Sequence, residues 1–233
     1  MKRLYPFLAS LSCVLFLSSG TPGGAGKGPQ GGRYKYGHYT LANGTRLAGQ
    51  LRCFLTHDDL LTKLEIEHKK GELTQVLGPA ELRSAVIGTD SMITIRLAEL
   101  RDTLNNKPVI DLAHVVMVGK ATLLMRREWG RNPGMMAAGP NGIMIGGDEE
   151  LARWAYQKAG TSRSYLLPLD DEDFKKQVAP LFVDFPSLCQ RIRCGDASQN
   201  DIKKIFYAYN LRADVNEVSS EQAEAACRYL VWK

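Results

Sequence analysis

Hydrophobic and polar residues alternate along much of residues 37–168, which is the pattern of strands with one buried face. The clearest example is the segment 37–54, whose two alternating halves meet at Asn43-Gly44. Because Asn-Gly readily supplies the positive φ angles of a type I′ turn, this segment predicts a β-hairpin.

Similar alternation, with many β-branched residues, predicts further strands downstream. They are expected at 61–68, 72–78, 84–88, 91–97, 109–119, 120–129, 153–160 and 163–169. Residues 149–158 have a helix as an alternative, because the sequence EELARWAYQK is rich in helix formers. The Gly- and Met-rich segment 130–147 predicts a loop without a role, with an adaptable binding surface as the alternative.

The alternation stops near residue 169, after which hydrophobic residues recur every three or four positions. This spacing predicts three or four amphipathic helices within 169–233. Pro180 should kink the first of them, and Ser219 with Gln222 forms a capping box for the last. In the last helix the inward-facing residues are expected to be Ala223, Ala226, Cys227, Leu230 and Val231.

These patterns together predict an α+β protein. An antiparallel β-rich body of six to ten strands is expected to precede a C-terminal group of three or four helices packed on it. The predicted divisions are a signal peptide at 1–20, a Gly-rich tether at 21–36, the β-rich body at 37–168 and the helical segment at 169–233.

The N-terminal segment has a basic start, an apolar run at 4–17 and small residues after it. This order is typical of a secretory signal peptide, so residues 1–20 predict export to the periplasm or cell envelope. A retained N-terminal anchor and a lipoprotein modified at Cys13 are the two alternatives. The glycines of 21–36 favour a flexible connection, and membrane contact is expected only through the leader.

The net charge of +5 comes from the N-terminal segment alone. Residues 1–36 hold five basic residues and no acidic one, so the 25 acidic residues of the remainder are matched by 25 basic residues. A nucleic-acid-binding protein needs a basic face on its folded body. The charge distribution therefore argues against a nucleic-acid partner.

Three cysteines of the helical segment are candidates for a disulfide: Cys189, Cys194 and Cys227. Export would permit such a bond, and the alternative is that they are free, buried thiols. No CxxC motif is present, so the sequence predicts neither a thioredoxin-like site nor a zinc finger.

The sequence also predicts no metal site and no cofactor. Its four histidines form no recognisable zinc-ligand spacing with the cysteines. His57 stands beside Asp58 and Asp59, which we interpret as a polar loop, with a metal site or an acid–base pair as the alternative. The acids at 170–173 lack the calcium-loop spacing and are interpreted as stabilising a helix N-terminus.

Motifs of nucleophilic catalysis are absent, since the chain contains no GxSxG and no SxxK. Paired carboxylates remain open, because their spacing is set by the fold and not by the sequence. The segment 126–129, Arg-Arg-Glu-Trp, is interpreted as a strand end with solvated charges, and a basic aromatic binding edge is the alternative. The sequence assigns neither catalytic nor binding residues.

Three motifs resemble a group of uncharacterised exported proteins common in Bacteroidota. The first is GHYTLANGTRLAGQL, which departs from the group at Thr45, where an acid followed by Thr is usual; the second is GPAELRSAVIGTDSMITI. The third is a helical pattern filled by Phe174, Lys175, Lys176, Phe182, Asp184, Pro186, Leu188, Ile192, Asp201, Ile202, Ile205, Tyr209 and Asn210. The resemblance implies location and architecture and brings no catalytic residues.

These observations favour a non-catalytic binding or interaction module of the cell envelope. Its partner would be an envelope protein or a surface component. The alternative is a hydrolase whose site is assembled from residues distant in the sequence.

Overall fold

The computed structural model describes residues 33–56, 61–67, 75–101, 108–131, 137–138, 144–145 and 148–227. The strands are β1 (Lys35–Leu41), β2 (Arg46–Leu55), β3 (Thr62–Glu67), β4 (Gln75–Leu77), β5 (Leu82–Ile87), β6 (Asp90–Arg101), β7 (Pro108–Met117), β8 (Ala121–Arg131), β9 (Ala137–Ala138), β10 (Met144–Ile145), β11 (Asp148–Lys158) and β12 (Ser164–Leu166). The helices are α1 (Asp171–Val178), α2 (Pro186–Cys194), α3 (Ile202–Leu211) and α4 (Ser220–Ala225), with 3₁₀ turns η1 (Pro79–Glu81), η2 (Ala179–Phe182) and η3 (Gln199–Asp201).

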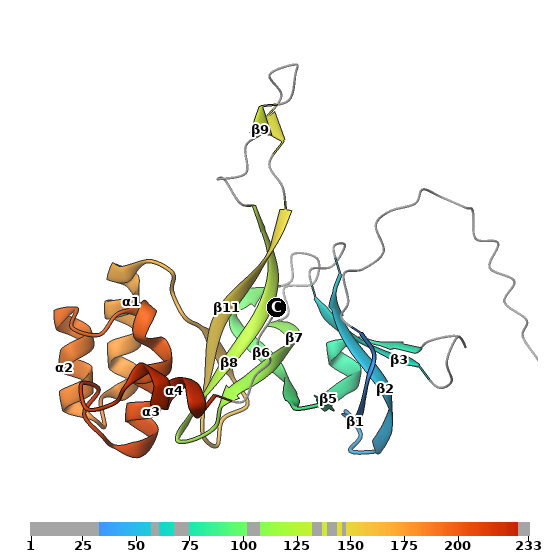
Figure 1. The fold of residues 1–233 in the computed structure, drawn as a ribbon, viewed down its shortest axis with the longest axis horizontal. Coiled ribbons are helices and arrows are strands. Elements are labelled where there is room, and N and C mark those ends of the chain that lie inside the picture. The colour runs from blue at the N-terminus through green and yellow to red at the C-terminus, as the bar shows by residue number, and fades with distance from the viewer. Residues whose placement is uncertain are drawn as a thin grey trace, which may run out of the picture.

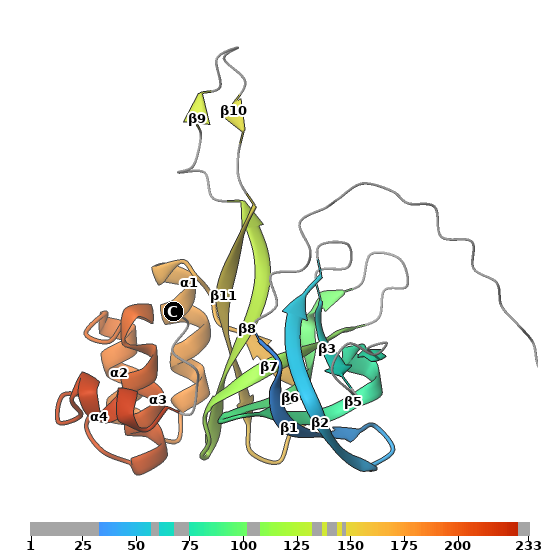
Figure 2. The same ribbon diagram turned by 45° about the vertical axis from the view of Figure 1, so that its right-hand side comes forward.

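The predicted α+β class is confirmed, because the β-rich body is followed by a group of helices. The helices gather on one side of the long β8–β11 hairpin, and β1, β2 and β3 lie on its other side (Figures 1 and 2). None of the helices in the described ranges is long and apolar enough to cross a membrane.

The predicted hairpin at 37–54 is confirmed as β1 and β2, which pair antiparallel from Thr40–Arg46 onward. Its turn is not type I′, because only Gly44, and not Asn43, has a positive φ. Asn43 instead accepts a hydrogen bond of 2.9 Å from the Thr45 amide through its side chain. Such a turn followed by a glycine with positive φ is the common longer alternative to the two-residue loop.

The strands predicted downstream are also found, and they pair with their neighbours in the chain. β3 pairs with β4, β5 with β6, β7 with β8, and β11 with β12, all antiparallel. The helix alternative for 149–158 is wrong, since β11 is a strand that pairs with β8 along its whole length. Its helix-forming residues are overridden by tertiary context, because β11 pairs with β8 and buries Ala155 and Tyr156 in two core clusters on its two faces.

One strand pairing has no counterpart in the sequence pattern. The main sheet runs in the order β12-β11-β8-β7-β6-β5-β1-β2-β3-β4, and β12 also pairs in parallel with β6 through Ser164 and Leu97. Strands β6, β7, β8, β11 and β12 therefore close into a ring, and the remaining five strands continue outward from β6.

Within the described residues the hydrophobic core has three parts. The ring encloses Ile95, Leu97, Ala113, Val115, Leu124 and Ala155. A second cluster lies among the N-terminal strands and contains Tyr39, Leu51, Leu64, Ile66, Leu77, Leu82, Ala85, Ile87, Met92 and Leu112. The third and largest packs α1–α4 against Met117, Leu123, Met125 and Tyr156 of the strands.

The helix ends follow the predicted signals. Asp170 caps α1 by accepting from the amides of Glu172 and Asp173, which supports the interpretation of 170–173 as helix-stabilising acids. Pro180 lies in η2, where α1 has ended, and Ser219 forms the predicted capping box of α4 with Gln222. Leu230 and Val231, expected to extend the last helix, lie outside the described residues.

Several residues of the third sequence motif fix the helices to one another. The Tyr209 hydroxyl donates to Asp184 at 3.0 Å, and Arg212 forms an ion pair with the same carboxylate. The rings of Phe182 and Tyr209 are 4.7 Å apart between centroids. Arg212 and Tyr209 both hold the pKa of Asp184 below its usual value. These motif residues join the start of α2 to the end of α3.

Candidate functional site

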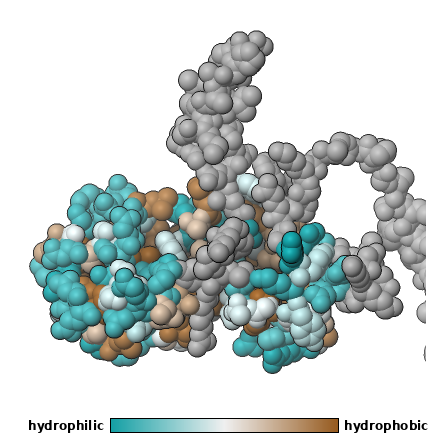
Figure 3. Space-filling model, viewed as in Figure 1, coloured by the Kyte–Doolittle hydropathy of each residue, from teal (hydrophilic) through white to brown (hydrophobic). Residues whose placement is uncertain are grey.

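A groove runs between the β-rich body and the helical group, around Trp154 of β11. Trp154 is partly buried against the core that the helices share with the strands. Its backbone carbonyl accepts a hydrogen bond of 2.9 Å from Leu167, which holds β11 beside the chain leaving β12. On the visible face, hydrophobic residues show where the helical group meets the strands, while the rest of the helical surface is mainly hydrophilic (Figure 3).

The groove has an apolar and a polar half that share Trp154, Gln199, Asn200 and Ile202. The apolar half has a volume of about 240 Å³, and its other lining residues are Ala152, Leu167, Pro168, Leu169 and Phe174. The polar half has a volume of about 370 Å³, and its other lining residues are Asp201, Lys203, Lys204, Ser220, Ala223 and Glu224.

The polar half is organised by an ion pair above the indole. Lys203 Nζ lies 5.9 Å from the centroid of the Trp154 ring and 2.6 Å from Glu224 Oε2. A cation over an indole is attracted by the ring quadrupole. The pair joins α3 to α4 and fixes the charged side of the groove relative to its aromatic floor.

A helix cap fixes one further charged group of the polar half. Asp201 accepts from the Ser198 amide at 3.1 Å in the capping box of η3. Ser220 follows the cap of α4. The groove thus presents an aromatic surface, amide groups and charges that are already held in place, which suits recognition of a ligand with apolar and polar groups side by side.

A second hollow lies on β1, β2 and β5. It is larger than either half of the Trp154 groove, about 470 Å³, but more open, and its walls are Tyr36, Gly37, His38, Arg46, Leu47, Ala48, Val86 and Gly88. Tyr36 is 68% exposed there. We prefer the Trp154 groove as the candidate site because it is formed jointly by the two parts of the molecule, where ligand sites commonly occur.

The interpretation of the segment 126–129 as a strand end with solvated charges is wrong. Arg126 and Arg127 are buried, not solvated, and they do not form an exposed binding edge. Arg126 Nε lies 2.6 Å from Asp111 Oδ2, and Glu128 bridges Arg126 and Arg153 at 2.8 and 3.1 Å. The charged side chains of Asp111, Arg126, Glu128 and Arg153 face the interior of the ring at one end of its apolar core. The sequence pattern predicts that the charges of 126–129 face solvent instead.

Asp111 connects this network to the N-terminal strands. Its Oδ1 accepts hydrogen bonds from the amides of Thr62 and Leu112 at 2.9 and 2.8 Å. Burial raises the pKa of Asp111, and Arg126 opposes that shift. Because the carboxylate is engaged on both oxygens by β3, β7 and β8, we assign the network a structural role.

The three cysteines predicted as disulfide candidates are free thiols in this structure. Cys194 accepts from Gln190 at 3.2 Å, whereas the Cys227 thiol donates to the Ala223 carbonyl at 3.1 Å, and Cys189 is buried. The disulfide stays a prediction. His57, Asp58 and Asp59, residues 1–32 and most of 130–147 lie outside the described residues.

Comparison with known proteins adds no relative. No family model, no curated protein and no solved structure matches the chain. The candidate site therefore rests on its own geometry. Sequence reasoning missed it because Trp154, Asn200 and Glu224 are far apart in the chain, and no local motif connects them.

Proposed function

We propose that the protein is a non-catalytic binding protein of the cell envelope and that the Trp154 groove is its binding surface. The leader at 1–20, the tether at 21–36 and the resemblance to exported proteins support the location. The observation that carries the binding role is the division of the groove into an apolar and a polar half on either side of one indole.

The arrangement suits an extended segment of a partner. An aliphatic or aromatic group would enter the apolar half between Trp154 and Leu169, whose side chain is exposed at the rim. Polar groups next to it would meet Asn200 and the Lys203–Glu224 pair. Aromatic anchors surrounded by fixed polar groups are typical of binding surfaces.

The geometry favours binding over hydrolysis for a specific reason. Lys203 and Glu224 are paired with each other and Asp201 caps η3, so both acidic groups that line the groove already have structural partners. A hydrolytic acid or base would need to be directed at a substrate instead. The hydrolase alternative consequently finds no support in this groove.

The test is crosslinking of the tagged full chain in its native cell envelope, followed by quantitative mass spectrometry. Asn200→Arg fills the groove from an exposed position, and Gln190→Arg adds the same charge on α2 outside it. One envelope partner should be enriched with the parent and with Gln190→Arg, and its yield should fall at least tenfold with Asn200→Arg and with Trp154→Ala.

Two results would contradict the proposal. Equal capture by all variants would exclude the groove as the binding surface. Absence of any enriched envelope partner, with the folded protein abundant in the sample, would contradict the binding role itself.

A further inference from the structure

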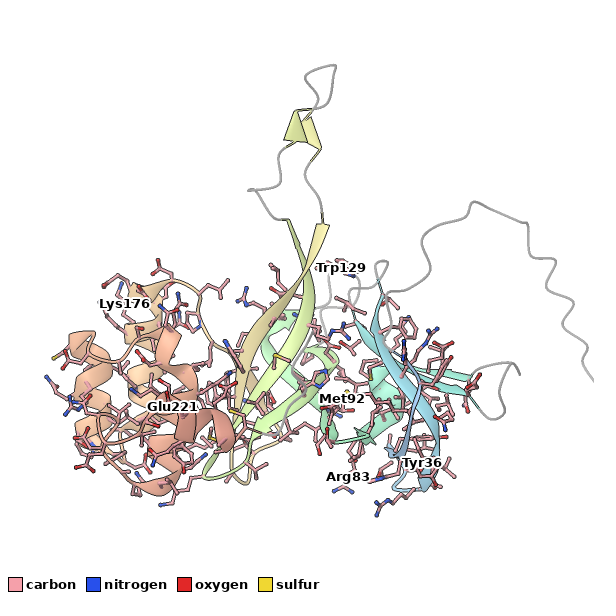
Figure 4. All side chains as sticks on the ribbon, in the orientation of Figure 1. Tyr36, Arg83, Met92, Trp129, Lys176 and Glu221 are labelled. Carbon is pink, nitrogen blue, oxygen red and sulfur yellow. The ribbon has the colours of Figure 1, made fainter. Side chains whose placement is uncertain are left out.

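A cysteine and a methionine sulfur meet in the core of the N-terminal strands. The Cys53 thiol on β2 donates to the thioether of Met92 on β6, with 3.3 Å between the two sulfur atoms. Met92 is buried within the N-terminal cluster, and Cys53 packs against that cluster. Figure 4 shows Met92 between the long hairpin and the N-terminal strands.

A histidine stands beside this sulfur pair. His114 of β7 is the register partner of Met92, and Met125 of β8 is the partner of His114. Register partners on neighbouring antiparallel strands point to the same face, with Cβ atoms about 5 Å apart. Met92, His114 and Met125 therefore form one buried row, with the Cys53 sulfur in contact with its first member.

We propose that Cys53, Met92 and His114 form a binding site for a soft monovalent metal ion, Cu(I) or its analogue Ag(I). Thiolate and thioether ligands select Cu(I) over harder ions, and imidazole binds copper as well. This inference is independent of the groove and of the proposed binding function.

The protonation states suit such an ion. Burial, and secondarily Arg127, lower the pKa of His114 to about 4, so its imidazole is neutral near pH 7 and carries a lone pair. Burial raises the pKa of Cys53 to about 12; Arg127 opposes this shift, and the carboxylates of Asp111 and Asp90 add to it. The thiol is thus protonated when the metal is absent.

Charge balance decides between a monovalent and a divalent ion. Binding of M⁺ breaks the S–H bond, forms an S–M bond and releases one proton to solvent, so the buried site keeps its net charge. A divalent ion such as Zn²⁺ would add one further positive charge near the buried Arg127 guanidinium; the acidic groups that also act on Cys53 are Asp111, which is already paired with Arg126, and Asp90. Uncompensated charge in a core is strongly unfavourable.

The movement of the two sulfur atoms that metal binding requires is small. Two sulfurs bound to one ion at about 2.3 Å each, with a trigonal angle, lie roughly 4 Å apart. The sulfurs of Cys53 and Met92 would separate by a fraction of an ångström from 3.3 Å, which the flexible methionine side chain can supply. Within the described ranges no three His, Cys, Asp or Glu residues are grouped for a metal, so the site depends on its methionine.

The test is a titration of the reduced full chain with Cu(I), without oxygen, against a chromophoric Cu(I) chelator. The parent should retain one Cu(I), and Zn²⁺ should not displace it. Met92→Leu preserves volume and apolarity, and it should weaken Cu(I) binding at least tenfold. Cys194→Ser removes an exposed cysteine of α2 and should leave the affinity unchanged.

A second variant and a spectroscopic measurement guard against misfolding. His114→Gln should also weaken binding, and X-ray absorption of the Cu(I) form should show two sulfur neighbours and one nitrogen. The proposal is overturned if the parent retains no Cu(I), if folded Met92→Leu binds as tightly as the parent, or if Cys194→Ser removes the ion.

Discussion

Asn210, near the end of α3, hydrogen-bonds both backbone polar groups of Ala121, at the first position of β8. Its Oδ1 accepts from the Ala121 amide at 3.1 Å, and its Nδ2 donates to the Ala121 carbonyl at 3.1 Å. The same side chain lies where a Cβ on Gly119 would be, only 2.2 Å from its Cγ. The amide thus acts as a local strand partner that attaches the helices to the β7–β8 turn.

Asn210→Ala should lower the free energy of unfolding by about 1–3 kcal/mol, because two backbone groups of Ala121 lose their partner. Urea unfolding measures this loss, with Asn200→Ala as a control on the exposed surface. Gly119→Ala should destabilise the parent but cost less in the Asn210→Ala background, since the clash partner is gone. If the stability costs of Gly119→Ala and Asn210→Ala were strictly additive, the contact between these two positions would be contradicted.

Arg126→Met should cost about 3–5 kcal/mol of stability, because it leaves the Asp111 carboxylate buried without its cation. Arg96→Met on β6 removes an exposed arginine and should change stability by less than about 0.5 kcal/mol. Adding Asp111→Asn to Arg126→Met should restore part of the loss by removing the unpaired charge. Chemical denaturation of the parent, the two arginine variants and the double variant measures these costs. Equal costs for Arg126→Met and Arg96→Met would refute the prediction.

Acidification should destabilise the protein through His114. Its pKa is about 4 in the folded state and about 6.5 in an unfolded chain, so only the unfolded state takes up the proton between these values. The contribution is fully present above pH 6.5 and is lost as the pH falls to 4, at most about 3 kcal/mol. In urea titrations from pH 7 to 4, His114→Gln should show a smaller loss of stability than the parent.

Thiol reactivity should separate the cysteines by exposure. Cys194 is exposed and should react first with an aromatic disulfide reagent at pH 8, and Cys194→Ser should remove that fast phase. Cys53 should react last, because burial raises the pKa of its thiol to about 12. In protein isolated without reductant, two fewer reactive thiols than in the reduced sample would show one disulfide, and absence of the fast phase would show that Cys194 takes part in the bond predicted among Cys189, Cys194 and Cys227.

Local patterns predicted most elements because they depend on neighbouring residues. Asn43-Gly44 indicates its hairpin, and Ser219 with Gln222 indicates the start of α4. Arg126 was misinterpreted because a charge in a strand normally faces water, and its partner Asp111 is fifteen positions away on another strand. The Trp154 groove depends on how β11, α3 and α4 pack, which no pattern within one element records.

The parallel pairing of Ser164 with Leu97 has a consequence for the order of folding. A chain that leaves the ribosome or a translocation channel N-terminus first can form the β1–β2 and β5–β6 hairpins early, because each joins near neighbours. The ring cannot close until Ser164 has emerged, so the part of β6 around Leu97, beyond its pairing with β5, waits for β12. A nascent chain that stalls before this point exposes an unfinished strand edge, and protection of that edge by a chaperone would matter most at this stage.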